Sequence, residues 1–337
     1  MTRPLRVGIV GSGVMGETHL AAWVAEGIPV TIFSQDAGRA SALAERFGAG
    51  FARSLDELLA DAEVVDICTP TDHHLEATAA AAAAGRRVIC EKPMARTLAD
   101  AQAMIACCSE AGVRLFVAQV VRYFPNYALA RQAVLDGTIG APAVIRLKRA
   151  TARPRQSPDH WLFDPARSGG LILDFMIHDF DFARWLAGEV VSVHCRSASV
   201  ERPSLGVEHA VAILTHASGA ISQVSGSWGY SLPVFRTSFE ISGSSGLIEQ
   251  DSAASPPLVA YLHAGAPGET RPVGLPESPL DENPYRLELR EFHRAISDGS
   301  PTRVEAADGL AALRIALAAD ESARTGLAVL IPSQARR

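Results

Sequence analysis

Residues 5–16 read Leu-Arg-Val-Gly-Ile-Val-Gly-Ser-Gly-Val-Met-Gly. A β-branched, apolar run leads here into three glycines spaced Gly-x-Gly-x-x-Gly, and a helical pattern follows. Glycines at this spacing permit a tight turn and let the backbone approach a pyrophosphate, while the helix N-terminus stabilises the anion. Alone, the pattern also fits an ordinary glycine turn, but its place after a first strand favours a dinucleotide site. The expected cofactor contacts in this loop are Gly11, Gly13, Val14, Met15 and Gly16.

The rest of the first third alternates short β-branched runs with helical segments, which is typical of a parallel sheet built from βαβ units. Ser54 and Thr97 are each followed three residues later by an acidic residue, the spacing of a helix-opening capping box. Gly85 stands where the alanine-rich helix should end. The expected strands are 5–10, 30–33, 64–68, 87–90 and 114–117.

From about residue 124 the pattern changes to a helix through Asp136, followed by longer strand-like runs. Ala217-Ser218-Gly219 fits a hairpin turn, which indicates a mostly antiparallel sheet. Residues 252–284, rich in proline, glycine and serine, predict a long surface excursion. The expected strands are 143–150, 190–200, 210–216, 220–228 and 235–241, and the expected closing helices are 285–297 and 306–325.

These patterns predict an α/β protein of two domains. A Rossmann dinucleotide-binding domain is expected over 1–123, and an α+β domain with a mostly antiparallel open sheet over 124–337. The second domain should bind substrate and mediate oligomer formation, because an open sheet with one uncovered face needs a partner. A homodimer or homotetramer is expected, and the C-terminal helices could pack back across the domain junction.

Composition supports a cytoplasmic globular protein. The 337 residues are 48% hydrophobic and 20% charged, with a net charge of −6. Nucleic acid is a poor partner for such a surface, because phosphate backbones require clustered excess lysine and arginine. No export signal and no run of about 20 apolar residues is present, so no membrane partner is expected. The five cysteines lack metal-binding spacing and are expected to be reduced.

Further motifs follow in a fixed order along the chain. They are Thr69-Pro70 with His74, Glu91-Lys92-Pro93, Arg122-Tyr123, and Ser168-Gly169-Gly170 with Asp174 and His178. In order and spacing the sequence resembles the Gfo/Idh/MocA family, the glucose-fructose oxidoreductase and inositol dehydrogenase group. The resemblance covers nearly the whole chain, including Phe292 and the segment Ala307-Asp308-Gly309-Leu310, and Glu-Lys-Pro is its most specific element.

The resemblance implies an NAD(P)-dependent dehydrogenase or reductase acting on a sugar, polyol, sugar acid or similar cyclic alcohol. It also implies that Lys92, Asp174 and His178 surround the reacting carbon. The residue types suit this role, because a carboxylate beside an imidazole raises its basicity and an ammonium stabilises a developing alkoxide. Asp174 and His178 are four apart in a helical pattern and so share one face.

Two plainer interpretations stay open for these residues. An Asp-x-x-x-His pair is commonly an ordinary surface pair, and Lys92 after a strand could be a solvated loop lysine. His178, Asp179 and Asp181 could suggest a metal, but adjacent helical residues diverge and no second ligand cluster is evident, so no metal is expected.

Other residues are assigned mainly by the resemblance. It places Thr69, Pro70, His74, Glu91 and Gln119 around the cofactor. It places Arg122 towards the substrate, where Trp161 could form a sugar-stacking wall, although a buried tryptophan is the simpler interpretation. His74 could instead belong to a helix-capping segment opened by Asp72.

The end of the second strand predicts the choice of cofactor. A protein selective for NAD usually has an acidic residue there, whereas this chain has Ser34 and Gln35. A serine hydroxyl does not repel a 2′-phosphate, and Arg39 could pair with it. NADP is therefore favoured slightly over NAD, although Asp36 could restore the acidic contact through a shifted turn.

Two other functions are compatible with the same fold. One is a dinucleotide-sensing regulator without turnover, against which the intact Lys92, Asp174 and His178 argue. The other is a glycosidase that uses tightly held NAD in a redox cycle. Net cofactor reduction during turnover would distinguish a dehydrogenase from the glycosidase.

Overall fold

The computed structural model describes residues 5–153, 160–200, 207–230, 234–254, 258–263, 270–273 and 282–332. Two compact units emerge from the contacts within the chain. Unit 1 comprises Met1–Tyr123, Asp164–Ser168 and Asp281–Leu310. Unit 2 comprises Phe124–Phe163, Gly169–Leu280 and Ala311–Arg337. The sequence assigned all of 124–337 to one domain, whereas here two segments of that range cluster with unit 1.

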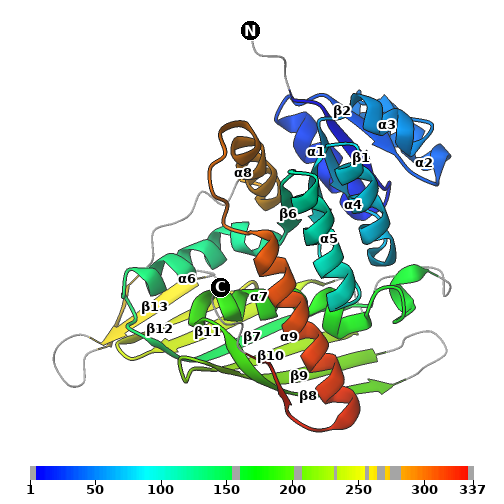
Figure 1. The fold of residues 1–337 in the computed structure, drawn as a ribbon. Helices are drawn as coiled ribbons and strands as arrows, with labels where there is room; N and C mark the ends of the chain where they lie inside the picture. The colour runs from blue at the N-terminus through cyan, green and yellow to red at the C-terminus, as the bar shows by residue number, and fades with distance from the viewer. Residues whose placement is uncertain are drawn as a thin grey trace. The chain divides into compact units, whose positions relative to one another are not determined.

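Unit 1 contains a parallel six-stranded sheet in the order β3-β2-β1-β4-β5-β6 (Figure 1). Every residue of β1, β4 and β6 is buried, as expected for parallel strands covered on both faces. Because all the pairings are parallel, the carboxyl ends of the strands lie at one edge, where such sheets bind ligands. The strands are β1 Val7–Val10, β2 Val30–Phe33, β3 Gly50–Phe51, β4 Val64–Ile67, β5 Arg87–Glu91 and β6 Leu115–Ala118.

The helices of unit 1 begin and end where the local signals predicted. Ser54 Oγ accepts a hydrogen bond from Glu57 N at 3.1 Å, and Thr97 Oγ1 accepts one from Asp100 N at 3.0 Å. Both predicted caps are therefore confirmed. The helices are α1 Val14–Ala25, α2 Ala37–Phe47, α3 Leu55–Asp61, α4 His74–Ala83, α5 Leu98–Glu110 and α8 Pro284–Asp298, with short 3-10 turns at Thr71–His73 and Val120–Tyr123.

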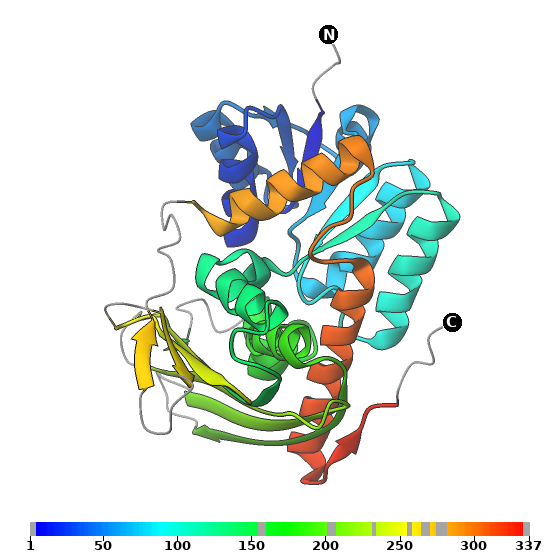
Figure 2. The ribbon, with the colours of Figure 1, turned by 90° about the vertical axis from the view of Figure 1, so that its left-hand side faces the viewer.

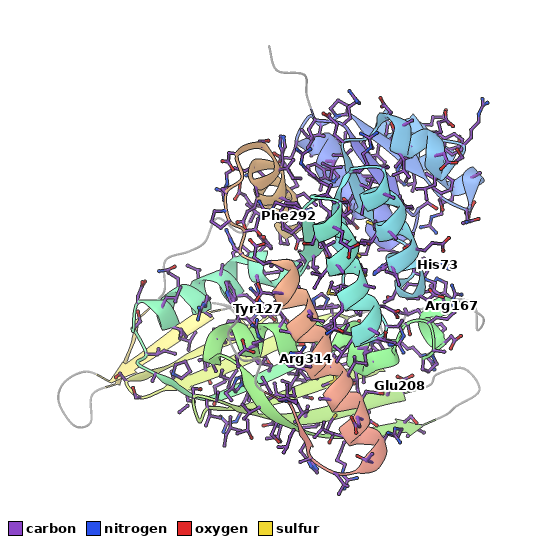
Figure 3. All side chains as sticks on the ribbon, in the orientation of Figure 1. His73, Tyr127, Arg167, Glu208, Phe292 and Arg314 are labelled. Carbon is purple, nitrogen blue, oxygen red and sulfur yellow. The ribbon has the colours of Figure 1, made fainter. Side chains whose placement is uncertain are left out.

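Helix α8 belongs to unit 1 because its apolar side fills the core there. Phe292 is fully buried and stacks on Phe116 with ring centroids 5.1 Å apart (Figure 3). Arg286 and Arg290 both pair with Glu26 at the end of α1, at 2.7 and 3.0 Å. Figure 2 shows α8 in orange beside the blue helix α1. Segments some 260 residues apart therefore share one core.

Unit 2 contains a nine-stranded sheet, counted over the described residues, in the order β14-β13-β12-β11-β7-β10-β9-β8-β15. Its pairings are antiparallel except for β10 with β7. The predicted hairpin is confirmed, since Ile221 pairs with Thr215 across residues 217–219. The strands are β7 Pro142–Ala152, β8 Val190–Val200, β9 Val207–His216, β10 Ile221–Tyr230, β11 Arg236–Gly243, β12 Gly246–Asp251, β13 Leu258–His263, β14 Thr270–Val273 and β15 Val329–Leu330.

One face of this sheet is covered by α6 (Pro125–Leu135) and α7 (Ile177–Ala187). Tyr127 of α6 packs between Phe182 of α7 and Phe239 of β11, with centroids 4.7 and 5.1 Å away. Figure 3 labels Tyr127 at this layer. Helix α9 (Ala306–Thr325) starts in unit 1 and continues in unit 2, where Ser322 Oγ accepts from Cys195 N at 2.8 Å.

The expected surface excursion over 252–284 is wrong in part. β13 and β14 extend the sheet outward from β12, with Leu247 paired to Tyr261. Residues 258–263 have a composition that is typical of a strand. The prolines and glycines on either side of them nevertheless led to the prediction of a surface excursion. Residues 255–257, 264–269 and 274–281 lie outside the described chain. No helix within the described ranges is long and apolar enough to cross a membrane.

Candidate cofactor and active site

The glycine loop has the geometry that a pyrophosphate requires. Gly11 has φ of +117°, and a Cβ there would lie 2.5 Å from Cys68 O. A Cβ at Gly16 would lie 2.1 Å from Gly11 O, so the helix can approach the loop only with glycine at this position. At Gly13, by contrast, a Cβ would meet no described atom within 4 Å. Gly11 and Gly16 therefore shape the loop, and Gly13 leaves its outer side open to a ligand.

Helix α1 begins directly after this loop with Gly13 as its N-cap residue, and no side chain caps it. Its first amide groups therefore remain available to an anion. Val14 at its start is 66% exposed, which is unusual for a large apolar side chain and suits a position beneath a bound ligand. The loop and α1 fit a dinucleotide.

Ser34 follows β2 directly, where the sequence placed it. Its Oγ accepts hydrogen bonds from Ser12 Oγ at 2.9 Å and from Asp36 N at 3.3 Å. Asp36 is the N-cap residue of α2, and its carboxylate accepts from Arg39 N at 3.0 Å. The Asp36 carboxylate is therefore already used to cap α2. Gln35 and Arg39 are exposed.

The ends of β4 and β6 carry polar atoms that a ligand would satisfy. Thr69 Oγ1 and both polar atoms of the Gln119 amide are buried without a hydrogen-bond partner among the described residues. Buried polar groups normally have partners, so such atoms at a ligand-binding edge indicate a missing ligand. These two residues therefore fit the predicted cofactor-binding role.

His74 connects the ends of β4 and β5. Its Nδ1 lies 3.0 Å from Pro93 O and its Nε2 lies 3.0 Å from Thr69 O. Burial lowers the pKa of His74, and the carbonyl of Thr69 partly opposes this effect. The ring thus fixes the backbone after Lys92 and beside Pro70. Asp72, which the sequence offered as a helix cap, instead pairs with Arg167 at 2.6 Å.

Asp174 and His178 lie on a distinctive segment of unit 2. Gly169 and Gly170 both have positive φ, and a π-helical turn at Leu171–Phe175 follows and leads into α7. Between residues 171 and 183 every side chain is buried except Asp174 and His178, which are half-buried. Asp174 and His178 are therefore the two accessible side chains in this range, and each lies on a different one of two successive turns. π-Turns of this kind occur frequently at functional sites.

The start of α7 is fixed by a buried ion pair. Arg149 of β7 donates from Nε and Nη2 to the two oxygens of Asp179, at 2.8 and 3.0 Å. This bidentate pair fixes the backbone next to His178. It also engages the carboxylate that the sequence had considered as a metal ligand beside His178.

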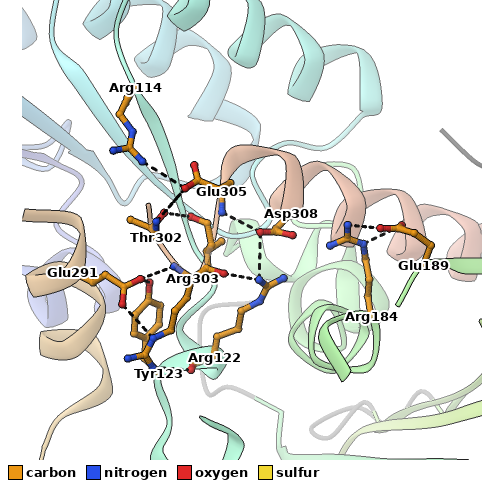
Figure 4. Close-up of polar contacts among 11 residues, drawn as sticks. Arg114, Arg122, Tyr123, Arg184, Glu189, Glu291, Thr302, Arg303, Glu305 and Asp308 are labelled. Carbon is orange, nitrogen blue, oxygen red and sulfur yellow. Dashed lines mark hydrogen bonds and ion pairs between the residues drawn. The ribbon is translucent and has the colours of Figure 1, made fainter. Parts of the chain in front are cut away.

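Arg122 has a different environment from the one expected for a substrate ligand. It is 2% exposed, and its Nη1 donates to Arg303 O at 2.6 Å and to Asp308 Oδ2 at 3.3 Å. Glu291 accepts from Tyr123 and Arg303 in the same cluster (Figure 4). Gly309 is required nearby, since a Cβ would lie 2.8 Å from Val117. These contacts favour a role for Arg122 in anchoring the segment that follows α8.

Trp161 lies in a short 3-10 turn, Trp161–Phe163, and is half-buried. The His160 ring is 5.9 Å from it. Arg153 lies over the Phe163 ring at 4.4 Å and within 3.8 Å of Glu208. Residues 154–159, which precede this turn, lie outside the described chain. A sugar-stacking role for Trp161 stays a prediction.

A buried ionisable cluster was not foreseen from the sequence. His19 of α1 lies 3.0 Å from Asp66 of β4 through Nδ1 and 3.1 Å from Glu91 of β5 through Nε2. Glu288 of α8 is fully buried next to them. One signal was available, since Asp66 interrupts the apolar run Val64-Val65-Asp66-Ile67 and a charged residue inside a buried strand requires partners.

The fold, the glycine loop and the orphaned polar atoms define a dinucleotide-dependent oxidoreductase. Residues 5–119 match the model described as oxidoreductase family, NAD-binding Rossmann fold, and residues 127–249 match the GFO/IDH/MocA C-terminal domain. The chain belongs to the Gfo/Idh/MocA oxidoreductase family, as the sequence motifs predicted.

Several characterised relatives match over nearly their whole length. Myo-inositol 2-dehydrogenase of Thermotoga maritima is 32% identical, over 94% of this chain and 96% of the relative. 1,5-Anhydro-D-fructose reductase of Ensifer adhaerens is also 32% identical, over 97% and 98%. A solved structure of levoglucosan dehydrogenase with NADH and L-sorbose superposes with a TM-score of 0.88 at 26% identity, over 99% of this chain and 100% of that one.

Proposed function

We propose that this enzyme transfers hydride between a nicotinamide cofactor and a carbon–oxygen bond of a sugar, polyol or similar cyclic alcohol. Two observations, one in each unit, support the proposal. Unit 1 has an open glycine loop, and unit 2 has Asp174 and His178 as the accessible positions of an otherwise buried segment. Relatives named for inositol, anhydrofructose and levoglucosan support the substrate class.

Each residue of the proposed site has a distinct task. His178 removes the hydroxyl proton of the alcohol during oxidation, and Asp174 raises the basicity of the imidazole. The ammonium of Lys92 stabilises the developing alkoxide. The bound nicotinamide supplies the hydride acceptor or donor. Gly13, Thr69, Gln119 and the first turn of α1 hold the cofactor.

We infer that NADP is admitted alongside NAD and slightly favoured, because Ser34 presents no charge and Asp36 is engaged in capping α2. Arg39 is exposed on the first turn of the same helix, where it could pair with a 2′-phosphate.

The test is turnover across a panel of polyols, sugars and anhydrosugars with NAD and with NADP, followed by the near-ultraviolet absorbance of the reduced cofactor. Substrate-dependent net reduction is the expected result. Glycosidic cleavage without net reduction would indicate the glycosidase alternative. Tight cofactor binding with no turnover on any member would favour the regulator.

A further inference from the structure

We propose that Asp66, His19 and Glu91 form a buried positioning chain that holds the backbone of Lys92 in its working place. The inference rests on the proposed function, since it assumes that Lys92 acts on the substrate hydroxyl. It assigns a role in turnover to three residues of the sheet interior. They are positioning residues, because they act through Lys92.

The chain is continuous from the core of unit 1 to the end of β5. Trp23 Nε1 donates to Asp66 Oδ2 at 2.8 Å, and the same carboxylate faces His19 Nδ1 at 3.0 Å. His19 Nε2 lies 3.1 Å from Glu91 Oε1. The second oxygen of Glu91 accepts the backbone N–H of Lys92 at 3.0 Å. Three elements of the unit, α1, β4 and β5, thus converge on one peptide group.

The charges around His19 match this geometry. Burial is the largest single influence and lowers the pKa of His19, but the charge and hydrogen bond of Asp66 together with the adjacent Cys68 outweigh it, so the pKa is raised well above its usual value. A protonated imidazole donates from Nδ1 to Asp66, and its positive charge attracts the Glu91 carboxylate, which lies at ion-pair distance from Nε2 without the geometry of a hydrogen bond.

The other ionisable groups that face His19 leave this charge in place. They are the thiol of Cys68, 3.5 Å from His19 Nδ1, and the carboxyl group of Glu288. The thiol of Cys90 lies beyond them in electrostatic contact with Cys68 and Asp66. Burial raises the pKa of Cys68 to about 12, and it raises that of Cys90 well above its usual value, so both remain thiols. Burial, then the charge of Glu91, raises the pKa of Glu288 well above its usual value, which favours the neutral form of this side chain.

A buried ionic chain is a poor device for stability alone, because apolar residues of similar volume commonly stabilise as well or better. Its role here is instead to fix the direction in which the Glu91 carboxylate points. Glu91 is 5% exposed, so its carboxylate cannot turn to solvent, and the bond to Lys92 N is charge-assisted. His74 holds Pro93 O on the other side of the same turn. The peptide groups on both sides of Lys92 are thereby fixed.

The experiment is a double-mutant cycle on turnover. His19→Gln, and the isosteric Asp66→Asn as a second variant, are each made in the native chain and in Lys92→Ala. Turnover is expressed per site that binds NADH or NADPH in a fluorescence titration, so that molecules that fail to fold do not count. A misplacement of about 1 Å can cost about a hundredfold in rate, so we expect a loss of at least about tenfold in the native chain.

In the Lys92→Ala background the same substitutions should change turnover less than about twofold, because the group they position is gone. Equal losses in both backgrounds, or no loss in the native chain, would overturn the positioning role. Near-native turnover of Lys92→Ala itself would instead contradict the proposed function. The control is His216→Gln, which removes a buried histidine of unit 2 bonded to Gly188 O and Ser222 Oγ. It should leave turnover per binding site unchanged.

Discussion

At the scale of single residues, Lys92→Ala, Asp174→Ala and His178→Ala are each expected to lower turnover while cofactor binding is largely kept. In the proposed site the three side chains act on the substrate hydroxyl, whereas the glycine loop holds the pyrophosphate. Loss of one acid–base group typically costs roughly a hundred- to ten-thousand-fold in rate. Steady-state kinetics and cofactor titration measure the two effects separately.

The matched control for this series is Asp56→Ala, which removes an exposed carboxylate in the first turn of α3. It should leave both quantities unchanged. Near wild-type turnover in all three active-site variants would end the catalytic assignment.

A second residue-scale prediction concerns Ser34. Ser34→Asp places a negative charge where the adenosine ribose is expected, and it should disfavour a 2′-phosphate by about tenfold or more. The dissociation constants of NADH and NADPH report the change as a ratio. Ser34→Ala removes the hydroxyl without adding charge and should change the ratio less. An unchanged ratio in Ser34→Asp would show that position 34 does not face the ribose.

Single residues also show which parts of the candidate site a sequence can name and which it cannot. Lys92, Asp174 and His178 were named because their motifs are local and ordered along the chain. The environment of Arg122 was missed because its partners, Arg303 and Asp308, are more than 180 residues away. The approach of Glu288 to Glu91 was missed for the same reason, because the two residues are far apart in the sequence. Hydrophobic periodicity predicts which side chains are buried but not which buried side chains meet.

At the scale of elements, the titration of Glu288 on α8 should make the free energy of unfolding depend on pH. Glu288 is neutral in the folded state because its pKa is raised, whereas in the unfolded chain it ionises near its ordinary value. Below the ordinary glutamate pKa, Glu288 is protonated in both the folded and the unfolded state, so it costs no free energy of unfolding there. As the pH rises towards the folded pKa, each pH unit costs about 1.4 kcal/mol of the free energy of unfolding.

Glu288→Gln cannot ionise in either state and should remove this dependence. The melting temperature of the variant minus that of the native chain should therefore increase between about pH 5 and pH 8. Thermal unfolding followed by circular dichroism across that range measures the difference. Glu45→Gln, an exposed glutamate on α2, serves as the control and should give a flat difference. A flat difference for Glu288→Gln would show that this side chain is ionised in the fold.

Elements with strong local signals were predicted almost to the residue. β2, β8 and α9 match their expected bounds, because a β-branched run or a helical period is bounded there by clear breakers. β12, β13 and β14 were missed. They are short, and their pairing depends on neighbours in the sheet rather than on their own composition.

At the scale of the whole molecule, the sheet of unit 2 has, opposite the face packed on α6 and α7, a face over which the described residues of this unit place no helix. Along β9 the side chains alternate, with Ala212 and Leu214 buried and Val211 and Ile213 about 40% exposed. Ile221 at the start of β10 is 46% exposed on the same side. Arg146 of β7 and Glu240 of β11 form an ion pair among the exposed positions further along the sheet. An apolar stripe with a charged margin is typical of an interface between copies.

We therefore predict that the native chain is a homodimer or homotetramer assembled through this face, and that Val211→Lys with Ile213→Lys dissociates it. Two buried lysines would meet their own copies across a symmetric interface, which like-charge repulsion and desolvation disfavour. Light scattering coupled to size-exclusion chromatography at micromolar concentration gives the mass directly. Leu135→Lys, which replaces a 61% exposed leucine at the end of α6, is the control and should keep the native mass. A monodisperse monomer for the native chain would contradict the assembly. An unchanged mass for the double variant would show instead that the copies meet through another surface.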